Sequence, residues 1–207
     1  MLPVHITKKL DEFFLEKEYA IIEENGEITL REKSNTGKAE LLCTLDEESI
    51  VFFKPEHKVL PYLDTQKPGA TSCADAFVFK KQKTSDKFDL HMFEFKKTVN
   101  TTHYSKVKHQ FTMGIYNARA IAGFLGMDLG EIYLYIGYRN DEMFPNKKSS
   151  LISLRANNNL QAINKIEEWK TGKCLLEIDD KKKRLVFRKI ELDEEGYGTI
   201  KVTTLER

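Results

Sequence analysis

The chain has 207 residues and a mass of 24.0 kDa, with 41% hydrophobic residues, 31% charged residues and a net charge of +1. This balance predicts one folded domain and excludes the disordered and fibrous classes. Because the net charge is close to zero, any binding to nucleic acid must depend on local clusters of basic residues.

The N-terminal part is predicted to form one helix followed by strands. Apolar residues recur with the period of an amphipathic helix from Thr7, a candidate cap, to Glu24, and Asn25-Gly26 ends this helix. Strand-like stretches follow at residues 27–31, 39–44 and 50–53, and residues 61–69 are predicted to form a loop.

The middle of the chain is predicted to be a hairpin, a long helix and a buried strand. Residues 74–80 and 90–97 form the hairpin strands around a polar segment at 81–89. A helix with a clear apolar stripe follows, capped by Thr101 or Thr102 and ending near Gly126. The nearly continuous apolar run at 131–138 predicts a strand buried on both faces of a central mixed sheet.

The remaining residues, 141–207, are expected to form a C-terminal elaboration on a core of residues 5–140, all within a single domain. The pattern predicts a loop at 144–150, a helix at about 160–171, and strands near 174–178, 184–190 and 199–204. The fold class that follows is α/β (α+β), with helices flanking a central mixed sheet.

Three charged residues lie on the predicted hairpin in a pattern that indicates a metal-binding or catalytic site. Because side chains alternate along a strand, Glu94 and Lys96 share one face while Phe93 and Phe95 point to the other. Asp75 lies on the neighbouring strand. Burying such charges without a purpose is costly, and opposed carboxylates form a site for a hard cation. The alternative is an exposed strand face on which Glu94 and Lys96 pair.

An Asp on one strand followed by Glu-x-Lys on the next, with a helix before and a helix and strand after, resembles the PD-(D/E)XK nucleases. The resemblance covers residues 5–140 and implies a restriction-endonuclease-like core. One departure is Ala74 in place of the family's proline.

The resemblance also implies the ligands and the chemistry. In that family the two acids and the carbonyl of the intervening residue, here Asp75, Glu94 and Phe95, hold Mg²⁺, for which Mn²⁺ can substitute. Lys96 would orient or activate the attacking water. Two carboxylates suit magnesium, which lowers the pKa of a bound water.

Family members often add a polar residue from the following helix, and Gln110 occupies a comparable place, where Lys106 and Asn117 lie on the same flank. An ordinary boundary residue is the alternative for Gln110. Some members also use an acid on the first helix, and the sequence does not choose among Glu12, Glu16 and Glu18.

The expected function is therefore metal-dependent hydrolysis of DNA phosphodiester bonds, of the restriction, repair or mobile-element defence type, with RNA and homodimer formation left open. Basic loops such as 80–87 would hold the DNA backbone. The rival hypothesis is a non-catalytic binding or assembly module with the same fold that uses the C-terminal elaboration as an interface. Trp169 on the last predicted helix is a candidate for that surface, and a core position is the alternative for it.

The expected location is the cytoplasm. The sequence has no apolar stretch behind a basic head and no run long enough to span a bilayer, so no membrane is expected as a partner. Three scattered cysteines, Cys43, Cys73 and Cys174, are unsuited to a zinc site and leave one thiol unpaired in any disulfide scheme.

Overall fold

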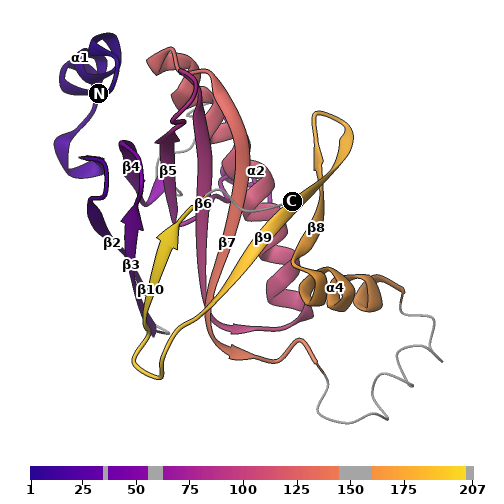
Figure 1. Ribbon diagram of the computed structural model, residues 1–207. Helices are drawn as coiled ribbons and strands as arrows, with labels where there is room; N and C mark the ends of the chain where they lie inside the picture. Colours follow the sequence, from indigo (N-terminus) through magenta and orange to yellow (C-terminus); the bar gives the residue numbers. More distant parts are fainter. Residues whose placement is uncertain (35–36, 56–62, 145–159, 204–207) are drawn as a thin grey trace.

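The structure, a computed structural model, describes residues 1–34, 37–55, 63–144 and 160–203. The fold is a mixed α/β arrangement, as the sequence predicts, with two sheets and helices against one of them (Figure 1). The restriction-endonuclease-like core stays a prediction.

The larger sheet has seven strands among the described residues, in the order β1-β4-β5-β6-β7-β9-β8. Their bounds are β1 Tyr19–Ile22, β4 Ser49–Phe53, β5 Ala76–Lys81, β6 Phe88–Val99, β7 Leu129–Asp141, β9 Lys181–Glu191 and β8 Lys173–Ile178. β6 is antiparallel to β5 and parallel to β7, and β7 is parallel to β9. The predicted hairpin and the predicted mixed sheet are therefore both confirmed.

The smaller sheet has the order β10-β3-β2 and packs on one face of the larger one. Its strands are β2 Glu27–Ser34, β3 Gly37–Leu45 and β10 Tyr197–Val202. Leu30, Leu41 and Ile200 from this sheet bury against Val78 and Phe93 of the larger sheet. A second core layer thus separates the two sheets.

The opposite face of the larger sheet is covered by α1 (Val4–Phe13), α2 (Thr101–Leu125) and α4 (Leu160–Thr171) (Figure 1). Alternation along β6 sends Met92 toward these helices and Phe93 toward the smaller sheet. Asn100, not Thr101 or Thr102, caps α2, since its Oδ1 accepts from the N–H groups of Thr102 and His103. Gly126, in the left-handed conformation, ends the helix.

The predicted helix at 7–24 is wrong in its second half. The helix begins at Val4 and ends at Phe13, because Phe14 is extended. After a short 3-10 turn at Glu16–Glu18, β1 pairs antiparallel with β4. Tyr and Ile favour strands, and β4 offers unpaired backbone groups at its edge, so pairing overrides the helical period here.

The C-terminal segment enters both sheets. β9 lies between β7 and β8 in the larger sheet, and β10 pairs in parallel with β3 in the smaller one. The predicted helix at 160–171 is confirmed as α4. The predicted loop at 144–150 lies outside the described residues, except for Phe144.

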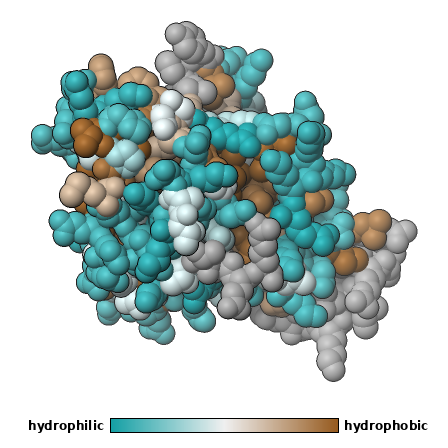
Figure 2. Space-filling model, turned by 45° about the horizontal axis from the view of Figure 1, so that its top comes forward, coloured by the Kyte–Doolittle hydropathy of each residue, from teal (hydrophilic) through white to brown (hydrophobic). Residues whose placement is uncertain are grey.

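No helix in the described part of the chain is both long and apolar enough to cross a lipid bilayer. Figure 2 shows a face on which hydrophilic residues predominate and hydrophobic ones form small separate areas.

Candidate metal and phosphate site

The candidate site lies where β5 begins beside the middle of β6. The β5–β6 register pairs Ala76 with Phe93, so Asp75, just before β5, stands opposite Glu94 on the same face of the sheet. The backbone N–H of Asp75 donates to the Phe93 carbonyl (2.9 Å), and the Phe95 N–H donates to Oδ2 of Asp75 (2.6 Å). The two carboxylates are therefore neighbours, as the hairpin prediction requires.

Glu94 is fully buried between the larger sheet and α2. Its Oε1 accepts a hydrogen bond from the Lys96 ammonium, whereas its Oε2 has no hydrogen-bond partner among the described residues. Burial and repulsion by Asp75 raise the pKa of Glu94 well above its ordinary value, against the opposing effects of Lys96 and Gln110. The alternative of an exposed Glu–Lys pair on a strand face is therefore wrong.

Lys96 supplies the positive charge of the group. Burial lowers the pKa of its ammonium, but the carboxylates of Glu94 and Asp75 outweigh this effect, and the net pKa lies above the ordinary value. Its side chain is 22% exposed. Lys96 is thus held in its charged form at the solvent side of the site, where it can meet an anionic group.

Gln110 reaches the site from the third turn of α2. Its side-chain amide donates to the Cys73 carbonyl (3.2 Å), two residues before Asp75, and hydrogen bonding with Gln110 lowers the pKa of Glu94. Asn117 contacts the same segment, with its amide 3.7 Å from Cys73 Sγ. Gln110 is half-buried and contacts the segment before Asp75, so its role in the site stays a prediction, whereas Lys106 on the same flank is exposed.

The residues present suit a hard divalent cation. The N–H and C=O of one strand residue point to the same edge, so the Phe95 carbonyl faces the β5 side, where its N–H meets Asp75. Two carboxylates then converge with a carbonyl, and one buried carboxylate oxygen makes no hydrogen bond within the described part of the chain. Oxygen donors of this kind suit Mg²⁺. No set of three His, Cys, Asp or Glu side chains in the described ranges forms such a group by itself, so the carbonyl would be essential.

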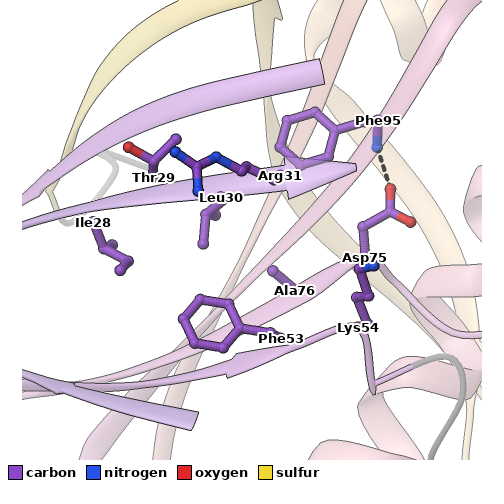
Figure 3. Close-up of a pocket in the computed structure, with 9 residues that line it drawn as sticks. All are labelled: Ile28, Thr29, Leu30, Arg31, Phe53, Lys54, Asp75, Ala76 and Phe95. Carbon is purple, nitrogen blue, oxygen red and sulfur yellow. Dashed lines mark hydrogen bonds between the residues drawn. The ribbon is translucent and has the colours of Figure 1, made fainter. Parts of the chain in front are cut away.

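A pocket of about 390 Å³ opens beside Asp75, between β2 of the smaller sheet and the ends of β4 and β5 (Figure 3). Its lining is Ile28, Thr29, Leu30, Arg31, Phe53, Lys54, Asp75, Ala76 and Phe95. Sequence reasoning missed Arg31 and Lys54. The position of Lys54, directly after an apolar strand, is a local signal that the sequence contains. Arg31 reaches the pocket because β2 approaches β4 and β5, and no local pattern predicts such a long-range contact.

Acidic partners partly neutralise two of the lysines, Lys80 of the predicted basic loop and Lys108 of α2. Lys80 is buried and binds Asp46 Oδ1 (2.8 Å) and the Val202 carbonyl (3.3 Å), so its side chain does not face solvent as a DNA-contacting loop would require. Lys108 pairs with Glu168 (2.8 Å). The hairpin strand at Lys181–Arg184 remains exposed.

Of the three candidate acids from the predicted first helix, Glu12 lies on α1 and is far from the site. Lys9 on the same helix donates to the Phe124 carbonyl, near the C-terminal end of α2. Gln110 is 14 residues earlier in that helix, which corresponds to roughly 20 Å at the α-helical rise. Glu16 and Glu18 follow in the 3-10 turn and not in α1.

Trp169 is fully buried, so its core alternative is confirmed and it is not part of a partner surface. Its ring packs against Tyr104, Tyr138 and Phe187, and its Nε1 donates to Asp141 (2.8 Å).

Comparison with family models, curated protein sequences and solved structures finds no match for this chain.

Proposed function

We propose that this protein is a metal-dependent nuclease that hydrolyses DNA phosphodiester bonds. The observation that carries the proposal is the convergence of Asp75, Glu94 and Lys96 on one face of β5 and β6, where the buried Oε2 of Glu94 makes no hydrogen bond with the residues that the structure describes. An unpaired buried carboxylate oxygen beside a second carboxylate is costly, and a divalent cation would remove that cost.

Each residue has a distinct part in the hydrolysis. Asp75 is oriented by the Phe95 N–H, and Glu94 by Lys96 and Gln110. Asp75, Glu94 and the Phe95 carbonyl would hold Mg²⁺, which would neutralise charge on the phosphate and lower the pKa of a water. The Lys96 ammonium would orient this attacking water and stabilise negative charge that builds up on the phosphate oxygens.

In the reaction, a water oxygen forms a bond to phosphorus in line with the sugar oxygen that leaves. The phosphorus–oxygen bond to that sugar breaks, one water proton is lost to the surroundings, and the leaving oxygen takes up a proton. The products are a phosphate monoester and a hydroxyl. Lys96, which lies on the exposed side of Glu94, is the protein cation placed to contact the phosphate.

The test is cleavage of supercoiled plasmid, single-stranded DNA and RNA of matched sequence in Mg²⁺ or Mn²⁺, with and without EDTA. Metal-dependent cleavage of DNA that disappears in Asp75→Asn is the expected result. Cleavage of RNA alone would change the substrate class but keep the chemistry. Absence of cleavage of all three substrates would favour the non-catalytic module.

A further inference from the structure

The pocket beside Asp75 has mainly apolar walls, whereas the candidate site consists of charged side chains. Ile28 and Leu30 of β2 and Phe53 of β4 form its apolar walls, and Figure 3 shows these side chains directed into the same space. Its volume of about 390 Å³ lies within the range for small-molecule sites, roughly 300–1,000 Å³. It is large enough for one planar ring system with its attached sugar.

Two cations stand at this pocket. Arg31 is 61% exposed on its side chain, and its Nε lies 3.5 Å from Oε1 of Glu40. The guanidinium group carries further N–H donors besides Nε. Lys54 is exposed and adopts φ +49°, an unusual conformation for a residue other than glycine. Such strain is retained mainly where the position serves a function. Apolar walls with a cationic rim match a base attached to a phosphate backbone.

The pocket and the candidate site share two residues. Asp75 and Phe95 line the pocket, and they are joined by the hydrogen bond from the Phe95 N–H to Asp75. A ligand in the pocket would therefore lie next to a phosphate held at Asp75, at the strand end where the pocket meets the candidate site. Because its volume of about 390 Å³ lies between walls from two different sheets, it fits one unpaired base and is too small for a base pair stacked within a duplex.

We propose that this pocket binds an unpaired nucleobase beside the phosphate that is cleaved, so that the protein selects single-stranded or locally unpaired nucleic acid over continuous duplex. This inference rests on the proposed nuclease function. Stacking of a base on an aromatic ring is sequence-tolerant, so the selection is for unpaired structure and not for a base sequence.

The experiment measures binding by fluorescence anisotropy without divalent metal, using the full chain. Three labelled DNA molecules of the same sequence are compared: a single strand, a perfect duplex and a duplex with one unpaired base. We expect the two molecules with an unpaired base to bind about tenfold more tightly than the perfect duplex. Equal affinity for all three would overturn the proposal.

Variants locate the effect in the pocket. Ile28→Trp fills it and should remove the tenfold advantage, whereas Ile21→Trp, a change of equal size on β1 outside the pocket, should retain it. Arg31→Ala, at an exposed position, offers a second variant that should fold normally and weaken the preference. The proposal fails if Ile28→Trp and Arg31→Ala both bind like Ile21→Trp.

Cleavage of the same DNA molecules in Mg²⁺ separates this inference from the function on which it rests. Cleavage without any preference for unpaired bases would retain the nuclease and overturn the pocket assignment. A pocket-dependent binding preference without cleavage would retain the pocket and overturn the nuclease. Absence of binding and of cleavage would overturn both.

Discussion

The N–H of Phe95 donates a 2.6 Å hydrogen bond to Oδ2 of Asp75, across the point where β5 begins beside β6. Phe95 is also the residue whose carbonyl is expected to complete the metal site. The bond therefore fixes one carboxylate and the carbonyl relative to each other before any cation binds, which reduces the cost of ordering the site.

Asp75→Asn should fold but should lose metal binding. The Asn carbonyl oxygen can still accept from the Phe95 N–H, so the cost in unfolding free energy should be no more than about 1 kcal/mol. Parent protein should show a higher melting temperature in Mn²⁺, as expected when a ligand binds only the folded state. An Asp75→Asn protein that Mn²⁺ stabilises as much as the parent would show that the cation binds elsewhere.

Glu94→Gln should be as stable as the parent or more stable in EDTA. The pKa of Glu94 is raised in the folded state by burial and by Asp75. The folded protein therefore holds its proton more tightly than the unfolded chain, and stability falls as pH rises toward the raised pKa. Gln does not titrate, so the stability of the variant relative to the parent should rise from pH 6 to pH 8, by up to about 1.4 kcal/mol per pH unit.

Thermal unfolding at pH 6 and pH 8, with and without Mn²⁺, measures this effect. The variant should also lose most of the Mn²⁺-dependent shift. Unfolding of Glu94→Gln at both pH values would instead identify the Glu94–Lys96 contact as a structural ion pair.

Lys96→Ala should reduce turnover by at least about a hundredfold, the scale seen when a group that stabilises transition-state charge is removed. Because lysine is not a metal ligand, Mn²⁺ affinity by calorimetry should stay within about tenfold of the parent, or about 1.4 kcal/mol. Lys97, exposed on the opposite face of β6, is the matched control. Lys97→Ala should keep most activity at low salt, and an inactive Lys97→Ala beside an active Lys96→Ala would refute the role of Glu94 as well.

Gln110→Ala should lower kcat about ten- to hundredfold with little change in KM, because it releases both Glu94 and the Cys73 carbonyl that precedes Asp75. Lys106→Ala, one turn earlier on α2 and exposed, should leave kcat unchanged. Steady-state kinetics on single-stranded DNA provides both constants. A change in KM alone would place Gln110 in substrate binding and not in the positioning of the carboxylates.

His91 should make stability depend on pH independently of the site. Its ring is buried between the sheets, with Nδ1 2.9 Å from the Tyr135 hydroxyl and no partner for Nε2 among the described residues. Burial and the charge of Lys80 hold the pKa of His91 well below its ordinary value. Below about pH 6.5 the unfolded chain therefore binds the proton first, and stability falls as pH decreases.

The limiting slope for one such group is about 1.4 kcal/mol per pH unit. His91→Phe should reduce the slope between pH 6.5 and the lower pKa by up to that amount. Urea unfolding at a series of pH values measures it. Identical slopes in parent and variant would mean that the pKa of His91 is the same in the folded and unfolded states.

The positions of the acids and the lysine in the site could be predicted because the signal is local. Alternation over a few residues places Glu94 and Lys96 on one face of β6, and a short hairpin brings Asp75 beside them. The 3.6-residue period of α2 likewise places Gln110 on a defined side. These relationships depend on backbone geometry within one or two elements, which the sequence specifies directly.

The sequence did not predict how distant segments pair. Tyr19–Ile22 has a helical apolar period but forms β1, because the edge of β4 provides backbone partners that a local pattern does not contain. The local sequence places Lys80 in a basic loop. In the structure its ammonium binds Asp46 and the Val202 carbonyl, which are 34 and 122 residues away in the chain.

By itself, then, the sequence determined the mixed α/β class, the β5–β6 hairpin and the face that Asp75, Glu94 and Lys96 share. Only the tertiary structure decided that Glu94 is fully buried and that β2 approaches β4 and β5 to form the pocket with Arg31 and Lys54. The physical reason is that side-chain direction follows from local backbone periodicity, whereas burial and pocket walls depend on contacts between segments whose pairing is settled by the free energy of the whole fold.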